Sequence, residues 1–208
     1  MESIQEYLLM KIKTTERQRF NFRIPDIIEA MLKHCYRYVV ESKKRAFEPT
    51  PETMRVIQSV ASWLKDGKVG LILTGKCGTG KSIMLQAIAL LIEYYNLERY
   101  PQYSMDVISA TEICNLSRKD DDLSRFKRCR YLGIDDLGTE SLTVKSWGTE
   151  LSPVLDILYC RYDSRSITII TTNDTIEELQ KKYGQRLYDR FCEIYDRIPF
   201  DFKSFRQN

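Results

Sequence analysis

The pattern of apolar and polar positions changes near residue 69. Beyond that point, short apolar runs rich in β-branched residues alternate with longer stretches in which apolar residues recur at helical spacing. Such alternation predicts a parallel sheet with helices on both faces, because a connection between two parallel strands needs room for a helix. The expected strands cover residues 69–73, 105–109, 131–135 and 166–172, and the expected helices cover residues 82–96, 111–128, 150–162 and 175–184.

The first 65 residues have a different pattern and are expected to form a small helical region. One helix is predicted to begin at Pro25, a favourable residue for a first helical turn, and another to span residues 51–64. The apolar positions that define the first of these helices are Ile27, Ile28, Met31, Leu32, Cys35 and Tyr38. We therefore expect an N-terminal region over 1–65, which could dock a partner or pack against the core, and an α/β core over 66–208.

A glycine-rich segment, GKCGTGKS, follows the first expected strand and matches the phosphate-binding pattern G-x-x-x-x-G-K-[ST] at every required position. Glycine lets main-chain N–H groups turn inward around a phosphate, and the N-terminus of the next helix favours an anion. Lys81 would reach the β- and γ-phosphates, and Ser82 would offer its hydroxyl to Mg²⁺. The candidate nucleotide contacts are Gly75, Lys76, Cys77, Gly78, Thr79, Gly80, Lys81 and Ser82.

Polar residues end two further expected strands. Asp135 and Asp136 follow an apolar run, and Thr172 and Asn173 follow another. The carboxyl ends of parallel strands meet at the ligand edge of a sheet. We therefore expect Asp135 to hold the Mg²⁺ shell, Asp136 to orient or deprotonate the attacking water, and Thr172 and Asn173 to face the γ-phosphate. The residues alone leave open whether Asn173 instead caps the helix that begins near Thr175.

Composition narrows the class of protein. The chain has 208 residues, 43% hydrophobic and 29% charged, which is typical of a globular domain. The longest apolar run is too short for a membrane span and no apolar targeting segment is visible, so a cytoplasmic protein without membrane contact is expected. Six scattered cysteines without a C-x-x-C pair exclude a zinc site as an interpretation. The single histidine, His34, excludes a histidine-centred catalytic triad and is expected on a helix surface.

The net charge of +3 permits contact with nucleic acid. A basic cluster, Arg125, Lys127, Arg128 and Arg130, surrounds Phe126 and could neutralise phosphates. The same pattern is also typical of a solvated helix face. Charge therefore leaves DNA contact open.

Five segments in this order, GKCGTGKS, YLGIDDLGTE, IITTN, YGQRLYDRF and FKSFR, resemble those of an AAA+ ATPase. More narrowly, they resemble the branch that contains DnaC/DnaI-type helicase loaders and IstB-like transposition ATPases. The resemblance covers residues 69–206. It implies a P-loop NTPase fold, a three-layer α/β/α sandwich with sheet order 5-1-4-3-2, and ATP and Mg²⁺ as cofactors. Because little chain follows Arg206, no full C-terminal helical lid is expected, so a neighbouring subunit would complete the site.

The resemblance also assigns roles to individual residues. It implies Walker A at residues 75–82, Walker B at Asp135 and Asp136, sensor I at Asn173, an arginine finger at Arg190 or, as second choice, Arg186, and a sensor II role for Arg206. In this branch a helical insertion before Walker B contacts single-stranded DNA. Residues 112–130 occupy that place, which makes the basic cluster a candidate DNA contact. Aspartate at 136, where many relatives have glutamate, implies slow ATP hydrolysis.

Several functions remain open at this stage. The leading hypothesis is an ATP-dependent helicase loader that forms a homo-oligomer with ATP and acts on a replicative helicase, on single-stranded DNA, or on both. A second is an accessory ATPase that marks double-stranded target DNA for a transposase. A third is a small-molecule kinase on the same scaffold. A fourth is an ATP-binding switch with very little hydrolysis.

Overall fold

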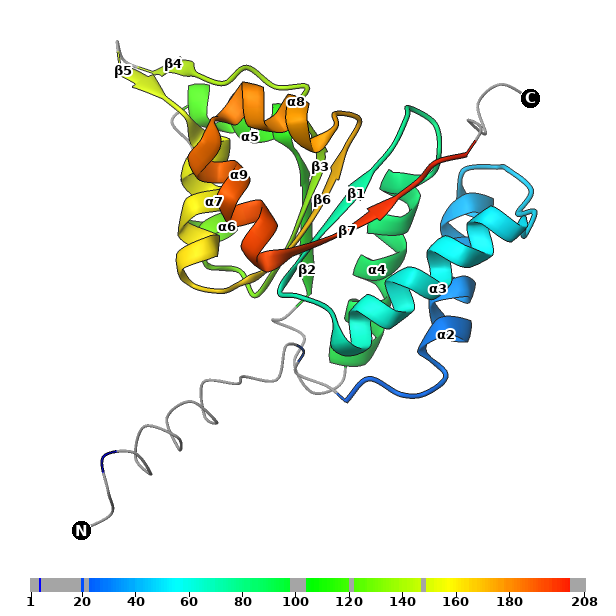
Figure 1. Ribbon diagram of the computed structural model, residues 1–208. Coiled ribbons are helices and arrows are strands. Elements are labelled where there is room, and N and C mark those ends of the chain that lie inside the picture. Colours follow the sequence, from blue (N-terminus) through cyan, green and yellow to red (C-terminus); the bar gives the residue numbers. More distant parts are fainter. Residues whose placement is uncertain are drawn as a thin grey trace.

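The computed structural model describes residues 4, 20, 23–97, 104–119, 122–146 and 149–202. A five-stranded parallel sheet forms its centre, with helices on both faces (Figure 1). The strands are β1 (Gly70–Thr74), β2 (Met105–Ser109), β3 (Tyr131–Leu137), β6 (Ile167–Thr172) and β7 (Tyr195–Pro199). They lie in the order β2-β3-β6-β1-β7, and every neighbouring pair is parallel. Numbered by position in the chain, this order is 5-1-4-3-2, which confirms the expected three-layer fold.

Alternating side chains of the strands supply two separate cores. Leu71 and Leu73 of β1 belong to the core on one face of the sheet, and Ile72 between them belongs to the core on the other face. The same alternation places Ile169 and Ile170 of β6 in different cores. This explains why the strands have nearly continuous apolar sequences, since a parallel sheet is buried on both faces.

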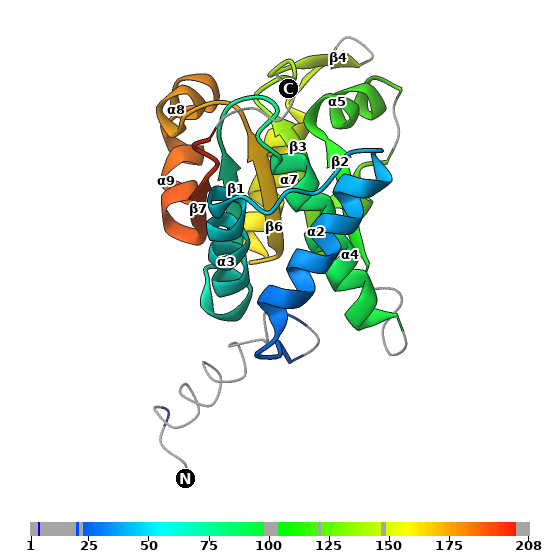
Figure 2. The same ribbon diagram turned by 90° about the vertical axis from the view of Figure 1, so that its right-hand side faces the viewer.

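Three helices cover the first face: α2 (Ile28–Ser42), α3 (Pro51–Asp66) and α4 (Lys81–Asn96). Figure 2 shows α2 crossing in front of α4, and both helices contribute to the same hydrophobic core as α3. The described part of the N-terminal region thus packs directly on the α/β core. Partner docking by this region stays a prediction.

The first of these helices differs in detail from the expectation. It begins at Ile28 rather than at Pro25. The Pro25 carbonyl oxygen accepts from the Ile28 N–H at 3.1 Å, a bond between residues three apart that forms a turn before the α-helix. Ile27 and Tyr38 lie on its outer side, with 65% and 63% of their surface exposed. The face that α2 buries is formed by Ile28, Leu32, Tyr36, Val39 and Val40.

The second face is covered by α5 (Ala110–Arg118), α6 (Ser124–Arg128), α7 (Pro153–Asp163), α8 (Ile176–Tyr183) and α9 (Gln185–Ile194). The helix predicted over 111–128 is in fact two helices, α5 and α6. The Asp122 carboxylate accepts from the Ser124 N–H at 2.8 Å and so begins the second one. None of the described helices combines the length and apolar character needed to span a membrane.

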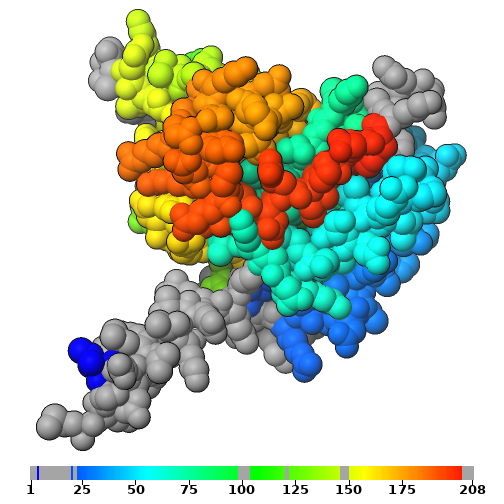
Figure 3. Space-filling view, in the orientation of Figure 1, coloured from blue at the N-terminus to red at the C-terminus, as the bar shows by residue number. Residues whose placement is uncertain are grey.

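The apolar pattern did not place two strand features, although the expected sheet order already implied a fifth strand. A hairpin of β4 (Val144–Ser146) and β5 (Thr149–Leu151) extends from the core between β3 and α7. The edge strand β7 crosses the molecular surface between α9 and α3, where Figure 3 shows it in red.

Candidate active site

The loop between β1 and α4 has the conformation that its glycines predict. Gly78 and Gly80 have φ angles of +82° and +97°, which residues with a Cβ rarely adopt. Gly80 is also the residue directly before α4, so the loop passes straight into the helix N-terminus. This geometry brings main-chain amides and the positive end of the α4 dipole to one place, which favours phosphate binding.

The buried side chain of Lys81 is hydrogen-bonded to the main chain of the glycine-rich loop. Only 4% of the residue is exposed, and its Nζ donates to the carbonyl oxygens of Gly75 at 2.6 Å and Lys76 at 2.9 Å. It also donates to Oδ1 of Asn173 at 2.8 Å. Neutral acceptors satisfy the ammonium protons without cancelling the charge, so the charge can still act on a phosphate.

Ser82 and Asp135 meet across the strand ends. Ser82 Oγ donates to Asp135 Oδ1 at 2.9 Å. Adjacent ligands of an octahedral Mg²⁺ are about 3 Å apart when each lies about 2.1 Å from the ion. The oxygen chemistry and the spacing of this pair therefore fit Mg²⁺ bound together with a nucleotide.

Asp136 lies in a distortion of β3. The pairing of β3 with β6 shifts between Ile134 and Leu137, and Asp136 has a left-handed φ of +54°. Its N–H donates to Oγ1 of Thr171 at 2.9 Å, and its carbonyl accepts from Oγ1 of Thr139 at 2.8 Å. Bulges of this kind redirect side chains next to active sites.

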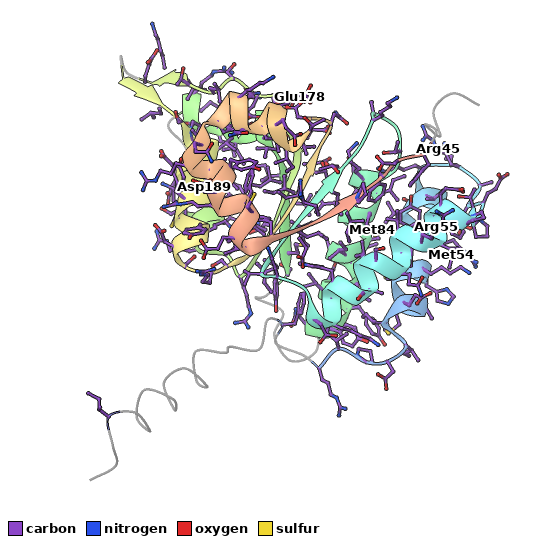
Figure 4. The ribbon with its side chains drawn as sticks, viewed as in Figure 1. Arg45, Met54, Arg55, Met84, Glu178 and Asp189 are labelled. Carbon is purple, nitrogen blue, oxygen red and sulfur yellow. The ribbon has the colours of Figure 1, made fainter. Side chains whose placement is uncertain are left out.

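Asn173 is not the cap of α8. That cap is Thr175, whose Oγ1 accepts from the Glu178 N–H while the Glu178 carboxylate accepts from the Thr175 N–H at 2.7 Å. Figure 4 labels Glu178 at its place on α8. Asn173 therefore has its contact with Lys81 instead. Thr172 does not face the site: it is fully buried, and its hydroxyl donates to the Leu137 carbonyl at 2.7 Å.

The basic cluster lies away from this site. It belongs to α6 and the residues that lead into the N-terminal end of β3, whereas the glycine-rich loop follows the C-terminal end of β1 (Figure 1). Arg125 forms an ion pair with Asp106, and Arg130 donates to the hydroxyl of Tyr131 at 3.2 Å. Arg128 is exposed. DNA contact by the four residues Arg125, Lys127, Arg128 and Arg130 stays a prediction.

The two candidate finger residues both lie on α9. The Arg190 guanidinium is 4.4 Å from the ring centre of Tyr159 and 4.3 Å from that of Tyr162. It also lies 3.7 Å from the Asp163 carboxylate. Arg186 is 5.2 Å from the Tyr159 ring. Both arginines therefore pack on their own chain, away from the Lys81 site, and Arg206 lies outside the described residues.

Sequence reasoning missed two residues next to the site. Thr171 is fully buried and contacts both aspartates. Glu140, 6% exposed, accepts from the Gly138 N–H at 2.9 Å and from the Tyr183 hydroxyl. Burial and this carboxylate raise the pKa of Tyr183 well above its usual range. The resemblance assigns no role to either residue, although Glu140 ends the segment YLGIDDLGTE and Thr171 lies in IITTN, directly before Thr172 and Asn173.

No protein-family model matches the chain. A curated relative, the replicative helicase loader DnaI of Bacillus subtilis (strain 168), is 31% identical over 165 residues, 72% of this chain and 51% of the relative. The chain thus spans about half the length of that relative.

Two solved structures share the fold. A crystal structure of the DnaC helicase loader has a TM-score of 0.59 at 17% identity and covers 79% of this chain and 97% of that one. The structure of AMPPCP-bound DnaA from Aquifex aeolicus has a TM-score of 0.50 at 20% identity, and the match covers 73% of this chain and 48% of that one. These similarities show that the chain has the P-loop fold of AAA+ type, and its sequence is similar to that of the helicase loader DnaI.

Proposed function

We propose that this chain binds ATP with Mg²⁺, hydrolyses it slowly, and thereby controls an association with a replicative helicase, with single-stranded DNA, or with both. The observation that carries the proposal is the contact network at the strand ends. Lys81 reaches Asn173, and Ser82 reaches Asp135, so residues from three separate motifs meet at one point. The 31% identity to a helicase loader supports the choice of partner.

Each residue has a distinct task in this proposal. The glycine-rich loop and Lys81 bind the phosphates, and Asn173 holds the Lys81 amine in place from the neighbouring strand. Ser82 and Asp135 would hold the Mg²⁺ shell. Mg²⁺, when bound with the nucleotide, neutralises charge that develops on the transferred phosphoryl group. Asp136 orients the attacking water or accepts its proton.

Assembly belongs to the same proposal. Arginine fingers act on the nucleotide of a neighbouring subunit in many ATPases of this mechanism. We assign that role to Arg190, with Arg186 as the second choice. In this arrangement the ATPase rate per subunit rises with protein concentration, and single-stranded DNA raises it further.

Two variants test the proposal. Lys81→Ala should abolish binding of a fluorescent ATP analogue, because the phosphates lose their buried cation. Asp136→Asn should retain binding but lower ATP turnover by about 10²- to 10⁴-fold, the usual contribution of a general base. Lys145→Ala, which removes an exposed lysine on the hairpin, is the matched control and should leave both unchanged.

The partner is tested with the cognate replicative helicase. The wild-type protein should form a complex with it by size-exclusion chromatography in ATP, with or without single-stranded DNA, and Lys81→Ala should not. Nucleotide binding by wild type without any ATP-dependent complex would contradict the helicase assignment and leave the nucleotide site intact. Equal ATP binding by wild type and Lys81→Ala would contradict the site itself.

A further inference from the structure

Thr171 lies opposite the bulge that carries the acidic pair. Along β3 and β6, Ile134 pairs with Ile170 and Leu137 pairs with Thr172. Two residues of β3, Asp135 and Asp136, therefore stand opposite the single residue Thr171 of β6. At that point the N–H of Asp136 donates to the side chain of Thr171.

The hydroxyl of Thr171 makes two contacts of opposite kind. It accepts from the N–H of Asp136 at 2.9 Å and donates its own proton to Oδ1 of Asp135 at 2.5 Å. A hydroxyl has one proton to donate and lone pairs to accept, so this pair of contacts fixes its orientation. The side chain is completely buried, and water does not replace either contact. One hydroxyl thus connects the carboxylate of Asp135 with the main chain of Asp136.

Two consequences follow for the acidic pair. Ser82 and Thr171 donate to the same oxygen of Asp135, and among the described residues its second oxygen accepts no hydrogen bond, so that oxygen is also available to the Mg²⁺ shell. For Asp136, the left-handed backbone is a conformation that residues with a Cβ adopt infrequently. The hydrogen bond to Thr171 helps to stabilise that conformation, which sets the direction of the Asp136 side chain.

We propose that Thr171 is a positioning residue for the metal shell and the catalytic carboxylate of this site. The inference rests on the proposed nucleotide function and adds to it a residue to which the resemblance assigns no role. Thr171 touches neither phosphate nor metal in this role; it acts by orienting Asp135 and Asp136. Comparable partners of metal ligands contribute about 10- to 100-fold to metal affinity or activity.

The same strand supplies a matched control. Thr168 is also fully buried, and its hydroxyl also has two contacts: it donates to the Ser166 carbonyl at 3.0 Å and accepts from Nε of Arg161 at 2.8 Å. It lies at the opposite end of β6 from the acidic pair. Thr168→Val therefore removes an equivalent buried hydroxyl without touching the site. Any effect shared by both valine variants reports on folding alone.

The experiment measures metal binding without requiring hydrolysis. Wild type, Thr171→Val, Thr171→Ser and Thr168→Val are titrated with Mn²⁺ in the presence of AMPPCP, and free Mn²⁺ is followed by electron paramagnetic resonance. Thr171→Val should weaken Mn²⁺ binding by about 10- to 100-fold. Thr171→Ser, which keeps the hydroxyl, should stay close to wild type, and so should Thr168→Val. ATP turnover at saturating Mg²⁺ is then compared, and the loss in Thr171→Val should appear in kcat more than in the KM for ATP.

Three results would overturn the inference. The first result is that Thr171→Val keeps both its Mn²⁺ affinity and its kcat within about twofold of the wild-type values. A residue that orients a metal ligand should lower them by at least about 10-fold when it is removed. The second is an equal loss in Thr171→Ser or in Thr168→Val, which would make the effect one of packing. The third is a wild-type protein that binds no AMPPCP at all, which would remove the proposed function and this role with it. If Thr171→Val does not fold, Thr171→Ser is compared with Thr168→Val. Weaker Mn²⁺ binding by Thr171→Ser, with wild-type binding by Thr168→Val, would contradict a positioning role for the Thr171 hydroxyl, because the serine variant keeps that hydroxyl.

Discussion

Removal of a single hydroxyl, by Tyr183→Phe, should destabilise the segment that follows the acidic pair. The Tyr183 hydroxyl donates to a carboxylate oxygen of Glu140, and the other carboxylate oxygen accepts from the Gly138 N–H at 2.9 Å. Only 6% of Glu140 is exposed, so water cannot take over the lost contact. Phenylalanine fills the same space, and the change therefore reports on the hydrogen bond rather than on packing.

The magnitude follows from the burial and charge of the acceptor. A hydrogen bond to a charged group contributes about 1.5–3 kcal/mol, and removal of one partner from a buried pair exposes that full contribution. In a domain of 150–250 residues, each kcal/mol corresponds to a change in Tm of about 2–4 °C, so Tyr183→Phe should lower Tm by about 3–12 °C. The 208-residue chain lies within this size class.

A second tyrosine provides the control. Tyr162 also donates to a glutamate, Glu193, but this pair lies at the surface, where 48% of the Glu193 side chain is exposed. Water can replace that bond, so Tyr162→Phe should change the free energy of unfolding by less than about 0.5 kcal/mol. Thermal unfolding by circular dichroism and urea unfolding of wild type and both variants measure the two effects. Equal shifts in the two variants, or an unchanged Tm in Tyr183→Phe, would refute the reasoning from burial.

Two further predictions use other features of the chain. Cys77 is exposed within the glycine-rich loop, so its alkylation by N-ethylmaleimide should block binding of a fluorescent ATP analogue. ATP should protect Cys77 from alkylation, and the reagent should not affect binding by Cys77→Ser. Undiminished binding by the alkylated wild type would contradict the role of the loop. Burial raises the pKa of Tyr36 to about 12, and the unfolded value is about 10, so the folded state keeps a proton that the unfolded state loses above pH 10. The stability from this group is complete below pH 10 and is lost between pH 10 and 12, by about 1.4 kcal/mol per pH unit. Other buried tyrosines, such as Tyr195 with a pKa raised to about 12, contribute the same kind of loss in both proteins. Urea unfolding at pH 9, 10.5 and 11.5 should therefore show a smaller loss in Tyr36→Phe than in wild type, and parallel curves would contradict the role of Tyr36.

The sequence predicts those parts of the site whose conformation is determined by residues close together in the chain. The glycine-rich loop is such a segment, because its positive φ angles follow from Gly78 and Gly80 themselves. The polar ends of β3 and β6 are another, because strands of a parallel sheet end at a common edge. Asp135 and Asn173 could therefore be placed at the ligand edge from the sequence, without knowledge of their contacts.

The parts that could not be predicted depend on register between distant segments. Thr171 became important because a bulge in β3 places it opposite Asp135 and Asp136, 36 and 35 residues away. The apolar pattern of β6 is the same with or without that bulge. Strand β7 was missed because its two buried hydrophobic residues, Tyr195 and Ile198, are three positions apart and do not alternate.

The N-terminal helices illustrate the same distinction. Their apolar periodicity correctly predicts helices, since period is a local property. The choice of buried face depends on what the helix packs against. In α2, Tyr36 and Val39 are buried in the core that this helix shares with α3 and α4, whereas Tyr38, and Ile27 directly before the helix, remain exposed despite their apolar character.

The surroundings of Arg190 bear on how an arginine could serve a neighbouring subunit. In the single chain its guanidinium lies between the rings of Tyr159 and Tyr162, and each such contact contributes about 0.5–2 kcal/mol. One of its nitrogens, Nη1, is buried and has no hydrogen-bond partner among the described residues, which costs about 1–3 kcal/mol. The ion pair with the exposed Asp163 adds at most about 1 kcal/mol. The favourable contacts and the unsatisfied nitrogen oppose each other and are of similar size, so movement of Arg190 toward a phosphate that satisfies Nη1 carries little net cost within its own subunit. A finger at this position would therefore be engaged by the phosphate of the neighbour rather than be permanently extended, in keeping with the proposal that the ATPase rate depends on assembly.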